Sequence, residues 1–117
     1  MSVLLARVPT AAGDAALRFA IDEATRRGEE LVVFHLKPKK TQSEVVEGVT
    51  VRHVVPDSMV LDPTEKLIDL VNIEEEDISV LVIGIKYRTP AGKLLLGSQS
   101  QRILLESPVP VIAVKPT

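Results

Sequence analysis

The 117-residue sequence contains no cysteine, which excludes disulfide bonds, thiolate metal sites and a cysteine nucleophile and is typical of proteins of the reducing cytoplasm. Tryptophan is also absent and aromatic residues make up only 3% of the chain, so the core must be built from aliphatic side chains. No aromatic platform exists for stacking nucleic-acid bases, and a net charge of -2 lacks the basic excess of a phosphate-backbone binder. We therefore expect a cytoplasmic protein that does not bind nucleic acid.

Long apolar runs are missing too, since none approaches the roughly 18 residues needed to span a bilayer. The first apolar run ends at Arg7 and has no charged region before it, which favours a strand over a signal peptide. The length and a hydrophobic content of 45% fit one domain with an apolar core. A single domain over residues 1–117, with no membrane partner, is expected.

Three segments are continuous aliphatic runs, which is typical of parallel strands that are covered on both faces. These segments are residues 3–8, 31–36 and 80–83. Two further strands, residues 49–55 and 109–114, have the features of sheet edges. The first alternates apolar and polar positions, and the second contains Pro110, which lacks an N–H.

Helix signals separate these strands. The first helix is expected over residues 14–27 and is ended by Gly28. A second is expected to begin after Asp62, which is its N-cap, and a third covers residues 98–106. The link over residues 37–48 has room only for a brief helix near 42–47. This alternation predicts an α/β fold with a five-stranded parallel open sheet in the order 3-2-1-4-5 and helices on both faces, a Rossmann-like arrangement.

The most informative segment joins the strand at residues 80–83 to the last helix through glycines and small hydroxyl residues. Ser98 stands three residues before Gln101, and this Ser-x-x-Gln pattern predicts a capping box, after which free backbone N–H groups face the loop. Open α/β sheets bind ligands at the carboxyl ends of their strands. A phosphate site and a plain capped helix start both fit this pattern.

Gly84, Gly97, Ser98 and Ser100 also fall on the nucleotide-binding motif of universal stress proteins. In that motif glycine, two residues, glycine, nine residues and glycine precede serine or threonine, and here Tyr87 replaces the second glycine. The chain resembles this family over nearly its whole length. The resemblance implies a homodimeric, cytoplasmic stress-response protein that binds ATP or another adenine nucleotide and is not an enzyme. The nucleotide-binding residues that it implies are Pro9, Thr10, Leu36, Gly84, Lys86, Gly97, Ser98, Gln99 and Ser100.

Family members that bind nucleotide usually have an aspartate just after the first strand, where its carboxylate meets the nucleoside. Depending on the alignment, Ala11 or Val8 occupies that place, and neither side chain accepts a hydrogen bond from a ribose hydroxyl. Asp14 is a substitute acceptor, and its other role is to start the first helix. We therefore expect weak binding through the phosphates, whose charge Lys86 and Arg88 could neutralise. Lys37, Lys39 and Lys40 fit either an anion site or, more simply, a solvated basic loop.

Two other readings of the sequence stay open: a partner-binding module without nucleotide, and an adenylate-forming or hydrolytic enzyme, which no nucleophile–base pair supports. His35 and His53 lack carboxylate or hydroxyl partners at a recognisable spacing, so no catalytic or metal role is expected of them. The acidic run over residues 74–77 is expected to be a solvated surface. The last strand is expected to form the dimer interface through its apolar residues Val109, Val111, Ile112 and Val114.

Overall fold

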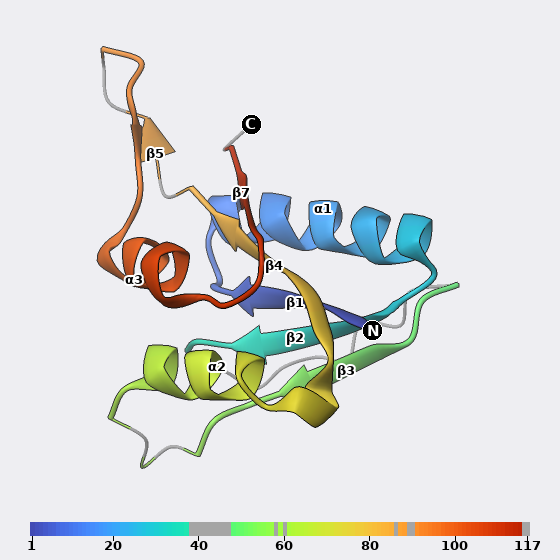
Figure 1. The fold of residues 1–117 in the computed structure, drawn as a ribbon. Coiled ribbons are helices and arrows are strands. Elements are labelled where there is room, and N and C mark those ends of the chain that lie inside the picture. The colour runs from blue at the N-terminus through green and yellow to red at the C-terminus, as the bar shows by residue number, and fades with distance from the viewer. Residues whose placement is uncertain (38–47, 58, 60, 86, 89–90, 116–117) are drawn as a thin grey trace.

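The central sheet has five parallel strands in the order β3-β2-β1-β4-β7 (Figure 1). The computed structural model describes residues 1–37, 48–57, 59, 61–85, 87–88 and 91–115. The strands are β1 (Ser2–Arg7), β2 (Glu30–His35), β3 (Val51–Val54), β4 (Ile78–Gly84) and β7 (Val111–Val114). The predicted strand order is confirmed, including the edge positions of β3 and β7.

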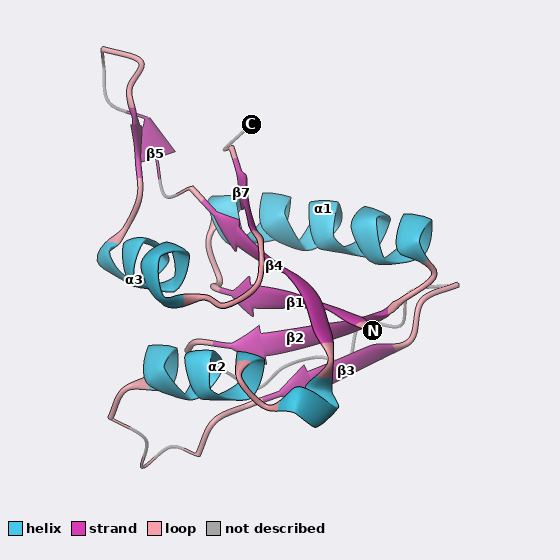
Figure 2. Cartoon of the chain, viewed as in Figure 1, coloured by secondary structure: helices cyan, strands magenta, loops and turns pink. Residues whose placement is uncertain are grey.

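Helices cover both faces of this sheet, as predicted (Figure 2). Helix α1 (Ala11–Arg27) packs on one face, where its buried residues Ala16, Ala20 and Ala24 let it approach the strands closely. Helices α2 (Pro63–Val71) and α3 (Ser98–Glu106) cover the other face. In the described part of the chain, no helix combines the length and apolar character that crossing a membrane requires.

Helix α1 begins at Ala11, so the prediction that Asp14 starts it was wrong. Thr10 is the N-cap, and its hydroxyl oxygen accepts a hydrogen bond from the Gly13 N–H at 3.0 Å. Gly13 lies in the first turn of the helix, and only glycine fits there because a Cβ would lie 1.8 Å from the Val8 carbonyl oxygen. The predicted end is confirmed: Gly28 has a φ of 65° and follows Arg27.

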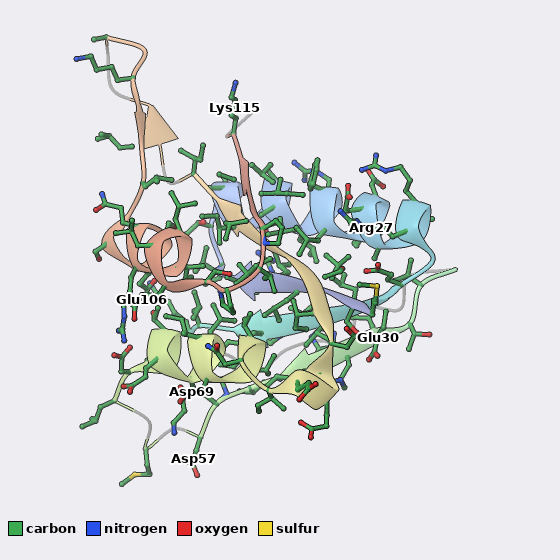
Figure 3. All side chains as sticks on the ribbon, viewed as in Figure 1. Arg27, Glu30, Asp57, Asp69, Glu106 and Lys115 are labelled. Carbon is green, nitrogen blue, oxygen red and sulfur yellow. The ribbon has the colours of Figure 1, made fainter. Side chains whose placement is uncertain are left out.

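Asp62 caps α2 as predicted, because its Oδ1 accepts a hydrogen bond from the Glu65 N–H at 3.2 Å. Its second oxygen receives Nη1 of Arg102 at 2.6 Å, and this ion pair ties the start of α2 to α3. The Arg102 hydrogen bond, together with that from Glu65, lowers the pKa of Asp62. Arg102 also pairs with Glu106, which lies at the end of α3 (Figure 3).

The acidic run lies largely on the exposed surface, as expected, and part of it forms a short 3-10 helix, η1 (Glu74–Glu76). Glu76 pairs with Arg52 of β3, which also reaches Glu30 at the start of β2 (Figure 3). Asp77 pairs with the N-terminal ammonium at 3.2 Å. These ion pairs join the amino ends of β1, β2, β3 and β4.

The segment between β4 and α3 contains a hairpin that the sequence did not predict. Strands β5 (Tyr87–Arg88) and β6 (Leu94–Leu95) pair antiparallel and project beyond the sheet (Figure 1). The brief helix expected near residues 42–47 lies outside the described residues, and so does Lys86.

Candidate functional site

A cleft of about 180 Å³ opens at the carboxyl edge of the sheet, beside the ends of β1 and β4. This is the topological switch point of the fold, because the chain builds the sheet outward in opposite directions from these two neighbouring strands. The residues that line the cleft are Val8, Thr10, Ala12, Lys37, Gly84, Gly97, Ser98, Gln99 and Ser100.

Most residues that the sequence assigned to nucleotide binding are brought together here, namely Thr10, Gly84, Gly97, Ser98, Gln99 and Ser100. Pro9 is not among the lining residues. Leu36 is only 4% exposed and packs into the core on the α2 side, so its side chain does not reach the cleft. Lys86 falls in a part of the chain that the structure does not describe.

The capping box predicted for α3 is wrong. Gly97 is the N-cap with extended backbone (φ −67°, ψ 163°), Ser98 is the first helical residue, and no side chain caps this end. The Gln101 side chain donates instead to the Leu96 carbonyl at 3.3 Å. The first N–H bonded within the helix is that of Gln101, which donates to the Gly97 carbonyl at 3.0 Å.

The start of α3 therefore offers free donors to the cleft. No described residue accepts a hydrogen bond from the backbone N–H of Ser98, Gln99 or Ser100, all of which line it. Such N–H groups and the positive end of the helix dipole favour an anion. The Ser100 hydroxyl donates weakly to the Gly84 carbonyl at 3.4 Å and so links the helix to β4.

Gly84 is required by packing. A Cβ at this position would lie 2.7 Å from the Ala12 carbonyl oxygen and 3.0 Å from its carbon. The end of β4 and the start of α1 can meet this closely only without a side chain, so Gly84 sets the distance between two walls of the cleft. The motif glycine thus shapes the site through its missing Cβ.

The first strand–helix turn presents no carboxylate to the cleft. Val8 lines it, whereas Ala11 is exposed and does not, so the geometry favours Val8 as the residue in the place of the family's acid. Asp14 is paired with Nη2 of Arg7 at 2.7 Å, while Nη1 of Arg7 donates to the Val8 carbonyl at 2.7 Å. The substitute acceptor considered from the sequence is thus held by Arg7 and lies outside the lining.

Lys37 supplies the one formal charge among the described lining residues. It follows the carboxyl end of β2, is exposed, and has no ion-pair partner in the described part of the chain. On the opposite wall, the Thr10 oxygen is occupied by the Gly13 N–H, which leaves the hydroxyl hydrogen free to donate. The Lys37 cation, the Thr10 hydroxyl and the N–H groups at the start of α3 are all groups that bind a phosphate.

His35 and His53 contact each other, a partnership that sequence reasoning missed. The His35 Nε2 lies 2.9 Å from the His53 Nδ1, with the rings stacked at a centroid distance of 5.2 Å. Burial, and then the proximity of His53 and Arg7, lower the pKa of His35 to about 4. Neither ring lines the cleft, and the described residues contain no cluster of three metal-binding side chains.

Comparison with known proteins identifies the family. The model of the universal stress protein family matches residues 39–115. A universal stress protein of Mycolicibacterium smegmatis is 39% identical in an alignment that covers 89% of this chain and 89% of the relative. The chain belongs to the universal stress protein family.

Solved structures of universal stress proteins share the fold. One from Archaeoglobus fulgidus is 27% identical, with a TM-score of 0.67 over 97% of both chains. Another structure from that organism, in complex with dAMP, is 23% identical and has a TM-score of 0.64 over 97% of this chain and 96% of its own. The five-stranded sheet of this universal stress protein is therefore the fold of its family.

Proposed function

We propose that this universal stress protein is a non-enzymatic regulatory protein of the cytoplasm that binds an adenine nucleotide weakly, mainly through its phosphates. The proposal rests on one observation: the unbonded backbone N–H groups at the start of α3 and the ammonium of Lys37 line the same cleft. The dAMP complex of the similar archaeal protein supports an adenine nucleotide as the ligand class.

The size of the cleft favours partial enclosure of such a ligand. Pockets that enclose a whole small molecule usually measure about 300–1,000 Å³. The described residues form about 180 Å³, which is room for phosphate groups with the nucleoside outside. The negative charge of phosphate groups bound in this pocket would be met by Lys37 and by the N–H groups of Ser98, Gln99 and Ser100.

The nucleoside side of the site is correspondingly weak. Val8 cannot accept a hydrogen bond from a ribose hydroxyl through its side chain, and Asp14 is engaged by Arg7. A hydrogen bond to a charged group contributes about 1.5–3 kcal/mol, so its absence lowers affinity roughly tenfold or more. Binding without catalysis fits the same lining, because none of its described residues is a carboxylate or an imidazole that could act as a general base.

A matched pair of variants tests this assignment. Val8→Asp places a carboxylate in the cleft lining, whereas Ala11→Asp places the same group on the exposed surface of α1. We expect Val8→Asp to make adenosine a competitor of ATP and Ala11→Asp to leave the wild-type ligand preference unchanged, as measured by calorimetric displacement. Gain of adenosine recognition by Ala11→Asp alone would place the nucleoside at the exposed position and refute this geometry.

We also propose that the protein forms a homodimer through β7. This strand lies at the sheet edge, and Val111, Ile112 and Val114 are each only partly buried in the protomer. An apolar edge with unpaired backbone groups favours an isologous contact with a second copy. Sedimentation at roughly tens of micromolar should show a dimer.

The exposed Ala113 offers the sharper substitution, because Val111 also packs against the protomer's own core. We expect Ala113→Arg to give a folded monomer with an unchanged circular dichroism spectrum. A monomeric wild-type protein, or an Ala113→Arg dimer as stable as the wild type, would place the contact elsewhere or exclude it.

A further inference from the structure

His35 and His53 form the most unusual contact outside the cleft. In the register of β2 and β3, His53 lies opposite Val33, so His35 is one same-face position further along the neighbouring strand. Both rings lie on the sheet face that α1 covers, since Val33 and Val51 belong to that side. His35 is 7% exposed, and the Nε2 of His53 is buried with no hydrogen-bond partner.

The short distance between the rings restricts their protonation. A nitrogen–nitrogen separation of 2.9 Å is a hydrogen bond in which one ring donates and the other accepts, so one shared proton suffices. An added proton places a positive charge at a buried position. A further proton removes the last acceptor and sets two cations against each other. The hydrogen bond therefore survives one added proton and is lost with the second, while burial opposes each added charge, so acid disfavours this arrangement.

The surrounding charges strengthen this preference for neutrality. Arg7 of β1 is a cation close enough to His35 to disfavour its protonation. Asp14 of α1 forms its ion pair with Arg7 and not with the histidines. Lys37 follows two residues after His35 but is exposed. Among the described residues, no carboxylate bonds to either ring.

Strand β3 is the element that can yield when the pair becomes charged. It is four residues long and lies at the sheet edge, where β2 is its only neighbour among the described strands, whereas β2 is held between β1 and β3 (Figure 1). Arg52 secures β3 from the opposite face through Glu30 and Glu76, but these pairs are partly exposed and so contribute little.

We propose that His35 and His53 act as an acid-sensitive latch that holds β3 on the sheet while neutral and releases it on protonation. Release leaves the edge of β2 unpaired, and a bare strand edge can pair with another chain. The domain would then respond to acidification through its sheet edge, independently of any ligand in the cleft.

Amide hydrogen exchange followed by NMR tests the latch. Between about pH 7 and about pH 5, we expect protection of the β3 amides to fall roughly tenfold or more after correction for intrinsic exchange, while β1 and β4 stay protected. The Cε1–H signal of His35 should titrate with the β3 amides. A His35 signal that titrates at the ordinary value while β3 stays protected would overturn the proposal.

Two variants separate the latch from other acid effects. His35→Phe keeps a flat ring against His53 but removes the buried group that takes up the proton, so β3 should keep its protection near pH 5. Arg52→Gln removes the carboxylate pairs on the opposite face and should retain the wild-type pH response. Equal acid loss in wild type and His35→Phe would refute the latch. The wild-type titration decides the question even if a variant fails to fold.

Discussion

Replacing Gly84 with alanine would test how the cleft is built. The new Cβ would lie 2.7 Å from the Ala12 carbonyl oxygen, closer than real Cβ atoms approach an oxygen, so the end of β4 and the start of α1 must separate. Overpacking of this kind costs about 1–3 kcal/mol. With roughly 4 °C per kcal/mol for a domain of this size, the melting temperature should fall by about 4–12 °C.

The new Cβ would clash with a backbone carbonyl rather than with a side chain, so a second substitution can test the reasoning. Adding Ala12→Gly removes only a methyl group 3.4 Å from the new Cβ and leaves the carbonyl in place, so it should not rescue the variant. Thermal melts followed by circular dichroism measure the stability, and calorimetry with ATP measures the accompanying loss of binding. A melting temperature within about 1 °C of the wild type would refute the reasoning.

Three further outcomes follow from the charged groups. The pKa of His35 is lowered to about 4 in the folded protein, so the buried neutral ring contributes its full stability above pH 6.5, the ordinary pKa of histidine. That contribution is lost as the pH falls towards 4. Urea unfolding should show a loss of about 2 kcal/mol between about pH 7 and about pH 5, and His35→Phe should abolish it. Arg102→Gln should raise the pKa of Asp62 towards its ordinary value, as carbon-detected NMR titration would show. Lys37→Gln should weaken ATP binding and its salt dependence, whereas Lys66→Gln, on the exposed side of α2, should change neither.

The fold was accessible from the sequence because its signals are local. Continuous aliphatic runs marked β1, β2 and β4, and Pro110 and alternating polarity marked the two edges. Asp62 and Gly28 could be recognised as helix ends because each caps its helix through contacts with residues only a few positions away in the sequence. Glycines and hydroxyl residues after a buried strand were enough to find the cleft, although not its depth or its ligand.

What failed depended on distant contacts or on ambiguous local patterns. Ser98 matched a capping box, but the chain turns one residue earlier and Gly97 takes the N-cap position. The first helix was predicted to begin at Asp14 rather than Ala11, since nothing local shows that Gly13 meets the Val8 carbonyl. The contact between the two histidines required the register of β2 and β3, and the two-residue strands of the hairpin are too short for a periodic pattern.

The most direct test of phosphate-led binding is a calorimetric titration of the wild-type protein with ATP, followed by displacement with inorganic triphosphate and with adenosine. The free helix start, Lys37 and the apolar Val8 predict weak binding of ATP, competition by triphosphate on similar terms, and no competition by adenosine. Displacement of ATP by adenosine, with triphosphate ineffective, would contradict the account.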